Sequence, residues 1–175
     1  MDPTAAILIM GNTGSGKTTL ARRLATHHNL VHLDLDTVVW VPQAVAEPRS
    51  PSDIAADLDR FVSDTGRWVI EGSYGDWAEH LSPAATGMLF LNPGIEACLR
   101  HQQARPWEPE KYVDPTEQRQ KLDFLLDWTR RYASRDDAYG EAWHRRVLEA
   151  FTGPKAEVID ADEAMASVAG WLKGP

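Results

Sequence analysis

Short apolar runs alternate with amphipathic stretches along almost the whole chain. Residues 5–10, 68–70, 88–91 and 158–159 are apolar at nearly every position, and residues 31–35 form a weaker run. Runs without polar alternation are typical of strands that are covered on both faces, as in a parallel sheet. We therefore predict five buried strands at these places.

Between the runs, apolar residues recur three and four positions apart, which is the spacing of one helix face. Leu20 and Leu24 show this spacing in the first stretch, and Ser50 and Ser52 precede the second stretch as caps. The alternation of strand and helix predicts a three-layer α/β fold with right-handed crossovers, interrupted only by a doubled helix after Arg105. The predicted helices span residues 17–28, 53–64, 95–103, 116–131, 137–151 and 162–172.

One junction between a strand and a helix carries a phosphate-binding motif. The segment Gly11-Asn-Thr-Gly-Ser-Gly-Lys17-Thr18 matches G-x-x-x-x-G-K-[ST] at every fixed position. Glycines let the chain wrap closely around a phosphate, and backbone N–H groups at the helix N-terminus face the anion. We expect Lys17 to reach the β- and γ-phosphates of ATP and Thr18 to bind Mg²⁺; the alternative is an ordinary glycine-rich turn. The predicted nucleotide-binding residues are Gly11, Asn12, Thr13, Gly14, Ser15, Gly16, Lys17, Thr18 and Thr19.

Three carboxylates follow the predicted strands at the end where parallel sheets bind ligands. Asp34 and Asp36 end the second strand, and Glu71 ends the third. Mg²⁺ prefers hard oxygen ligands and often keeps waters, so we expect one of these acids to hold a metal-bound water. Another is expected to accept the proton of an attacking hydroxyl. The alternatives are that Asp36 caps the turn at Thr37 and that Glu71 pairs with a surface arginine.

Aromatic residues are also predicted at this end of the sheet. Trp40, Tyr74, Trp77 and Trp107 fall in predicted loops, where they either line an acceptor pocket or simply pack. The longest predicted loop, residues 105–115, exceeds the usual connection length, and we interpret it as functional.

Charge is unevenly distributed along the chain. Its 175 residues include 18 basic and 26 acidic side chains, a net charge of −8, yet eight of the thirteen arginines lie within residues 100–146. Phosphoryl transfer needs positive charge beside the transferring group. We therefore predict a lid over residues 100–135, in which Arg100 or Arg105 meets the phosphates. The alternative for each arginine near a helix C-terminus is to complement the helix dipole.

Composition narrows the remaining possibilities. A net charge of −8 disfavours long nucleic acids as partners, because such binding depends on neutralising many phosphates. Cys98 is the only cysteine, which excludes an intrachain disulfide and a cysteine metal cluster. The N-terminal segment lacks a basic flank and a long apolar run, so we expect a cytoplasmic protein without membrane attachment. We expect a single domain over residues 1–175, present as a monomer or a homodimer.

Three segments support a resemblance to a known family: the phosphate loop, HLDLD at residues 32–36 and WVIEGSY at residues 68–74. The chain resembles the small P-loop kinases, which include shikimate kinase and the nucleoside monophosphate kinases, and most of all the adenylate-kinase-like proteins labelled "DNA topology modulation protein". This resemblance implies a P-loop NTPase fold: a parallel sheet in the order 2-3-1-4-5, helices on both faces and a helical lid. In shikimate kinase-like proteins an Asp-x-Asp pair has the same spacing from the lysine, which implies that Asp34 serves the metal and Asp36 contacts the acceptor hydroxyl.

The end of the third strand departs from the adenylate kinase pattern Asp-Gly-Phe-Pro-Arg. Residues 71–75, Glu-Gly-Ser-Tyr-Gly, are similar only in the first two positions. The missing arginine would bind a nucleotide's own phosphate, so its absence disfavours a nucleoside monophosphate as acceptor. We predict an ATP-dependent phosphotransferase that moves the γ-phosphate to a small hydroxyl-bearing molecule. The alternative is an ATP-binding regulator or slow ATPase that acts by conformational change.

Overall fold

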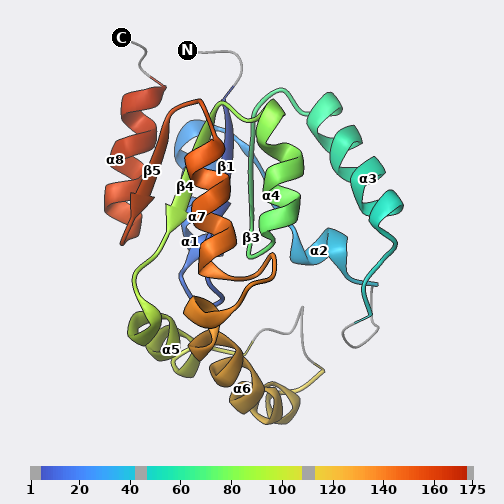
Figure 1. The fold of residues 1–175 in the computed structure, drawn as a ribbon, viewed down its shortest axis with the longest axis vertical. Helices are drawn as coiled ribbons and strands as arrows, with labels where there is room; N and C mark the ends of the chain where they lie inside the picture. Colours follow the sequence, from blue (N-terminus) through green and yellow to red (C-terminus); the bar gives the residue numbers. More distant parts are fainter. Residues whose placement is uncertain (1–4, 42–46, 108–112, 173–175) are drawn as a thin grey trace.

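The structure is a computed structural model that describes residues 5–41, 47–107 and 113–172 (Figure 1). Five parallel strands form one sheet in the order β2-β3-β1-β4-β5, as the resemblance implies. The central strands are buried at every position, whereas the two edge strands are partly exposed. The strands are β1 (Ala6–Met10), β2 (Val31–Asp34), β3 (Trp68–Gly72), β4 (Gly87–Leu91) and β5 (Lys155–Val158).

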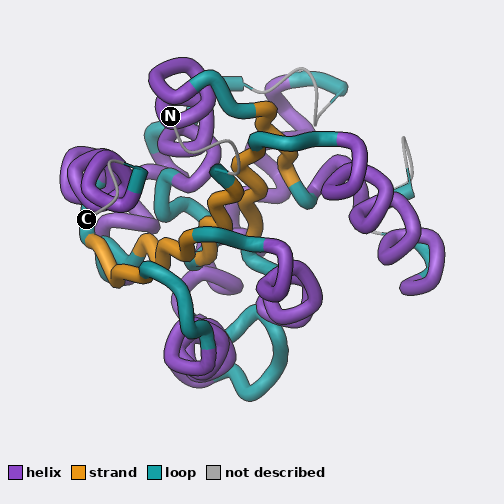
Figure 2. The backbone as a smooth tube through the Cα atoms, turned by 90° about the horizontal axis from the view of Figure 1, so that it is seen from above, coloured by secondary structure: helices purple, strands orange, loops and turns teal. Residues whose placement is uncertain are grey.

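Helices cover both faces of this sheet, which confirms the predicted three-layer fold (Figure 2). Alternate side chains of β1 point to opposite faces: Leu8 packs with α2, α3, α4 and α7, whereas Ile9 packs with α1 and α8. The helices are α1 (Lys17–His28), α2 (Asp36–Val39), α3 (Pro51–Asp64), α4 (Gly75–Leu81), α5 (Ile95–Gln103), α6 (Pro115–Arg130), α7 (Glu141–Ala150) and α8 (Ala161–Trp171).

Helices α5 and α6 lie beyond the carboxyl ends of the strands, at the bottom of Figure 1. They pack against each other and occupy much of the predicted lid, residues 100–135. The predicted functional loop at residues 105–115 falls partly on residues 108–112, which lie outside the described residues. Within the described part of the chain, no helix is long and apolar enough to cross a membrane.

Several predicted boundaries were wrong. The last strand lies at Lys155–Val158 rather than at 158–159, because an edge strand alternates exposed Lys155 and Glu157 with covered positions. The predicted helix 137–151 begins only at Glu141, since the Asp137 carboxylate accepts the Tyr139 N–H and fixes a turn there. The short helices α2 and α4 were not predicted, because four and seven residues are too few to show a helical repeat.

Candidate active site

The phosphate loop turns from β1 into α1 through conformations that only glycine adopts easily. Gly14 and Gly16 have φ angles of 78° and 98°. A Cβ atom on Gly14 would also lie 2.5 Å from the backbone oxygen of Cys98, so the loop lies directly against α5. The backbone of the motif thus has the curvature that a phosphate-binding loop needs.

The start of α1 offers donors for an anion. Gly16 occupies the N-cap position, and no side chain caps the first N–H groups of the helix. The buried hydroxyl oxygen of Ser15 has no hydrogen-bond partner among the described residues. Uncapped N–H groups at a helix N-terminus attract phosphate, so the loop residues fit the triphosphate of ATP.

Lys17 is buried beneath the loop, with 7% of its surface exposed. Its ammonium group donates a hydrogen bond of 2.8 Å to the backbone oxygen of Asn12. Burial lowers the pKa of Lys17, whereas the negative charges of Glu71, Asp36 and Asp34 act in the opposite direction. The three carboxylates predicted from the strand ends therefore all act on the predicted phosphate-binding lysine.

Glu71 is buried at the end of β3, with only 2% of its surface exposed. Its Oε1 atom lies 3.5 Å from Nε2 of His32 in β2. Burial alone would raise the pKa of Glu71, but His32, the Lys17 charge and Thr18 together lower it. The groups that act on Glu71 are thus His32, Lys17 and Thr18 rather than the surface arginine considered as an alternative.

Asp34 and Asp36 follow each other into a tight turn between β2 and α2. Asp34 Oδ1 accepts the N–H of Asp36 at 2.9 Å, and the Thr37 hydroxyl donates to the Asp34 backbone oxygen at 2.7 Å. The turn-capping role considered for Asp36 therefore falls on Asp34. The Asp36 carboxylate instead accepts a hydrogen bond of 2.6 Å from the Tyr74 hydroxyl.

The predicted aromatic residues divide into two groups. Tyr74 and Trp40 lie at the carboxylates, since the Tyr74 hydroxyl also accepts a 2.7 Å hydrogen bond from Trp40 Nε1. Trp77, predicted in a loop, lies within α4 and packs against the core instead. Trp107 is 46% exposed in the segment after α5.

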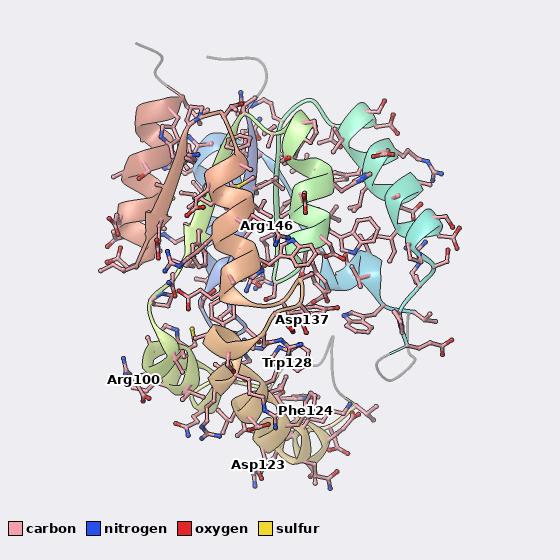
Figure 3. The ribbon with its side chains drawn as sticks, in the orientation of Figure 1. Arg100, Asp123, Phe124, Trp128, Asp137 and Arg146 are labelled. Carbon is pink, nitrogen blue, oxygen red and sulfur yellow. The ribbon has the colours of Figure 1, made fainter. Side chains whose placement is uncertain are left out.

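The predicted lid arginines lie on α5 and in the segment after it. Arg100 is exposed and points outward from α5 (Figure 3), while Arg105 is half-buried after the end of that helix. The face of α5 that meets the loop carries His101, whose Nδ1 lies 2.9 Å from the Gly14 backbone oxygen. The phosphate-binding role of both arginines stays a prediction.

Two further side chains attach the lid helices to the loop. Asn12 Nδ2 donates a 3.2 Å hydrogen bond to the Thr129 backbone oxygen in α6. Gln102 Nε2 donates to the Thr129 hydroxyl, which in turn donates to the Leu125 backbone oxygen. Nothing in the sequence indicated these contacts, because Asn12 and Thr129 lie 117 positions apart.

The oxygen atoms predicted for Mg²⁺ are those of Thr18 and Asp34. Within residues 5–41, 47–107 and 113–172, no group of three or more His, Cys, Asp or Glu side chains could hold a metal ion. Mg²⁺ commonly keeps several waters and takes only one or two carboxylates in nucleotide sites. A hydroxyl and a carboxylate beside the loop therefore fit a Mg²⁺ that arrives with the nucleotide.

No protein-family model matches the chain, and no curated protein matches it by sequence. Its structure is similar to a gluconokinase from Sinorhizobium meliloti 1021, with 17% identity, a TM-score of 0.55, and coverage of 99% of this chain and 94% of that chain. It is similar to a shikimate kinase from Bacteroides thetaiotaomicron, with 16% identity, a TM-score of 0.53, and coverage of 97% and 96%. A sugar kinase from Janibacter sp. HTCC2649 gives 17% identity, a TM-score of 0.54, and coverage of 98% and 95%. The chain therefore has the fold of the P-loop small-molecule kinases.

Proposed function

We propose that the protein is a kinase that transfers the γ-phosphate of ATP to a hydroxyl group of a small molecule. The observation that carries this proposal is that Asp34 and Glu71 occupy paired positions on neighbouring strands, that Asp36 is bonded to Asp34, and that all three carboxylates act on the buried ammonium group of Lys17. A phosphate loop alone would suit any nucleotide-binding protein. Carboxylates beside that loop add the proton acceptor that transfer to a hydroxyl requires.

The loop residues bind the triphosphate through backbone N–H groups, and Lys17 brings positive charge to the β- and γ-phosphates. Thr18 and Asp34 hold Mg²⁺ directly or through a bound water. When bound, Mg²⁺ neutralises charge on the phosphates. Glu71, which Thr18 stabilises as a carboxylate, would accept the Thr18 hydroxyl hydrogen and leave the Thr18 oxygen available to the metal.

Asp36 serves as the general base. Its carboxylate is held by the Tyr74 hydroxyl, and Tyr74 is held in turn by Trp40. Asp36 takes the proton of the acceptor hydroxyl while the acceptor oxygen bonds to the γ-phosphorus and the bond to the β–γ bridging oxygen breaks. Helices α5 and α6, which are attached to the loop through His101 and Thr129, act as a lid that excludes water from the transfer.

A transfer assay tests this function. The full chain is incubated with Mg²⁺, γ-labelled ATP and a panel of sugars, polyols, nucleosides and cyclic hydroxy acids. We expect one class to yield a labelled phosphate ester much faster than ATP is hydrolysed. Lys17→Ala, with folding verified by circular dichroism, should lower this rate by about 10³-fold or more.

If the label appears only as inorganic phosphate, at one rate with every acceptor, the kinase proposal is wrong. The protein is then a slow ATPase or a nucleotide-dependent regulator. A Lys17→Ala variant that keeps the full rate would instead contradict the assignment of the nucleotide site.

A further inference from the structure

A row of four aromatic rings leads from the carboxylate of Asp36 toward α6. We call Trp40, Tyr74, Tyr139 and Trp128 the aromatic row. Trp40 Nε1 donates to the Tyr74 hydroxyl, the ring centroids of Tyr74 and Tyr139 are 5.4 Å apart, and those of Tyr139 and Trp128 are also 5.4 Å apart. Tyr74 is buried and the other three are half-buried, so the row combines fixed rings with accessible aromatic surface.

The aromatic row begins where the proposed reaction takes place. The Tyr74 hydroxyl donates to Asp36 Oδ1 at 2.6 Å, and Asp36 acts electrostatically on Lys17. At its far end, Trp128 lies on α6, the helix that is bonded to the phosphate loop. A molecule that presents a hydroxyl to Asp36 therefore meets aromatic surface next to that hydroxyl.

The surroundings of the row are acidic. Burial raises the pKa of Tyr139, the carboxylates of Asp76, Asp137 and Asp36 raise it further, and the guanidinium of Arg135 acts in the opposite direction, so three negative charges and one positive charge act on this ring. An acceptor that carries its own negative charge would be repelled by these carboxylates.

The arginines beside the row are already paired. Arg135 lies with its guanidinium carbon 3.5 Å from the centre of the Trp128 ring, and both its Nε and one terminal nitrogen donate to the carboxylate of Asp137. Arg49 lies near Trp40, because the preceding residue Pro48 forms a β-bridge with Trp40. Its guanidinium donates to the Val38 backbone oxygen and to Asp57. A guanidinium that is bound in this way offers little to a substrate carboxylate or phosphate.

Other arginines lie away from the row. Arg146 lies on α7 beside Trp143, farther from the carboxyl edge of the sheet, and Arg100 points outward from α5 (Figure 3). The positive charges of these side chains therefore do not offset the carboxylates at Tyr139.

We propose that the phosphoryl acceptor is an uncharged ring compound with hydroxyl groups, a neutral sugar or a nucleoside, which packs a flat face against the aromatic row. This inference rests on the proposed function, because it takes Asp36 as the base that meets the acceptor hydroxyl. The C–H face of a sugar ring and the face of a nucleobase both pack well on aromatic rings. Sugar acids and nucleoside monophosphates are rejected, because their anionic group meets Asp137, Asp76 and a paired Arg135.

Calorimetric binding experiments test the acceptor class without turnover. The nucleotide site is first filled with Mg²⁺ and the β,γ-imido analogue of ATP. Neutral hexoses are then compared with their uronic acids, for example glucose with glucuronate, and nucleosides with their monophosphates, for example uridine with uridine monophosphate. We expect a neutral member to bind at least tenfold more tightly than its acidic partner, and the pair that binds distinguishes sugar from nucleoside.

Equal or tighter binding of the acidic partner overturns the inference, and so does a failure of every neutral member to bind while the ATP analogue binds. Both outcomes differ from failure of the proposed function, which would appear as binding of an acceptor without phosphate transfer.

Two pairs of variants localise the effect. Trp128→Leu should weaken binding of the neutral ligand about tenfold and leave the ATP analogue within about twofold, because Trp128 belongs to the proposed acceptor surface and not to the nucleotide site. The matched control Trp171→Leu, at a half-buried tryptophan of α8 on the other face of the sheet, should change neither. Equal losses for acceptor and nucleotide would indicate a general structural role for Trp128 and overturn the inference.

Asp137→Asn should release Arg135 from its charged partner and raise the affinity for the acidic ligand at least threefold, with the neutral ligand unchanged. Asp136→Asn, at the exposed neighbouring position, is the matched control. An acidic ligand that gains nothing from Asp137→Asn contradicts the idea that the Arg135–Asp137 pair excludes acids.

Discussion

The phosphate side and the acceptor side of the proposed site are built in different ways. The phosphate side is formed by residues 11–19, in which glycine conformations and one helix N-terminus supply the contacts. The acceptor side is formed by side chains of distant segments, and even the bond between Asp36 and Tyr74 spans 38 positions. Contacts from one backbone segment depend on the conformation of that segment alone, whereas contacts from distant side chains depend on the whole fold that brings them together.

The largest expected effect is a loss of transfer rate at the acceptor side without a loss of nucleotide binding at the phosphate side. Asp36→Asn removes the proposed base but leaves the phosphate loop intact. We expect the transfer rate to fall about 10²- to 10⁴-fold, as for the loss of a general base. Affinity for the ATP analogue should stay within about twofold, because backbone groups provide the phosphate contacts.

Single-turnover kinetics together with calorimetry measure both quantities. Asp64→Asn, at the exposed end of α3, is the control for loss of one carboxylate. If Asp36→Asn weakens nucleotide binding as much as it slows transfer, the two sides of the site are not separate.

The next effect tests how strictly backbone geometry determines the phosphate side. Gly14→Ala needs a φ of 78° and places its Cβ 2.5 Å from the Cys98 backbone oxygen. We expect unfolding free energy to fall by about 4 kcal/mol, from backbone strain and overpacking together.

Gly94→Ala is the matched control, since Gly94 also has a positive φ, of 88°, but nothing lies within 4 Å of its Cβ position. It should lose only the strain of a conformation that essentially only glycine adopts, with φ 88° and ψ 156°, about 1–3 kcal/mol. Urea unfolding measures both, and equal losses would show that the approach of α5 to the loop is unimportant.

The contrast between local backbone and distant side chains also explains which features the sequence predicts. The motif at Gly11–Thr18 predicts its own conformation, because each glycine stands where the loop needs one, and uninterrupted apolar runs identify the central strands. The carboxylates at the strand ends were predicted together, since parallel strands bring their carboxyl ends to one edge. Residue type and spacing were sufficient for all of these.

Contacts that depend on the path of later segments were not predicted. Thr129 looks like any polar residue of an amphipathic helix, yet it meets both Asn12 and Gln102. Arg135 ends the predicted lid, but its pairing with Asp137 and Trp128 depends on a turn that the pattern had assigned to a helix. Such contacts follow from tertiary packing, for which one sequence carries no local signal.

A smaller effect is a loss of stability in acid, caused by a histidine that is bonded to Ser73, the residue before Tyr74. His144 is buried between Tyr132 and the Ser73 backbone oxygen, and burial, aided by the Lys17 charge, lowers its pKa from 6.5 to about 4. The unfolded chain therefore takes up a proton at His144 between about pH 6.5 and pH 4, while the folded chain stays neutral there. Stability from this residue is complete above that range and falls by about 3 kcal/mol as the pH drops through it.

Urea unfolding at pH 7 and pH 4.5 measures this loss. His144→Gln should remove most of the difference, whereas His27→Gln, at an exposed position, should leave it unchanged. A wild-type chain that shows the same acid loss as His144→Gln would contradict the assignment to His144.

The smallest expected effect tests the bond that joins the lid helices α5 and α6. Thr129 and Thr26 both donate a hydrogen bond to the backbone oxygen four residues earlier, but only Thr129 also accepts from Gln102 in the interior. Thr129→Val should lower the unfolding free energy by about 1–2 kcal/mol, because the buried amide of Gln102 loses its acceptor. Thr26→Val should cost at most about 0.5 kcal/mol, since Thr26 is exposed. Hydrogen exchange locates the change, because faster exchange in α5 and α6, with α1 unaffected, would place the lost stability at the lid. Equal losses of unfolding free energy for the two variants would show that the Gln102 contact contributes nothing.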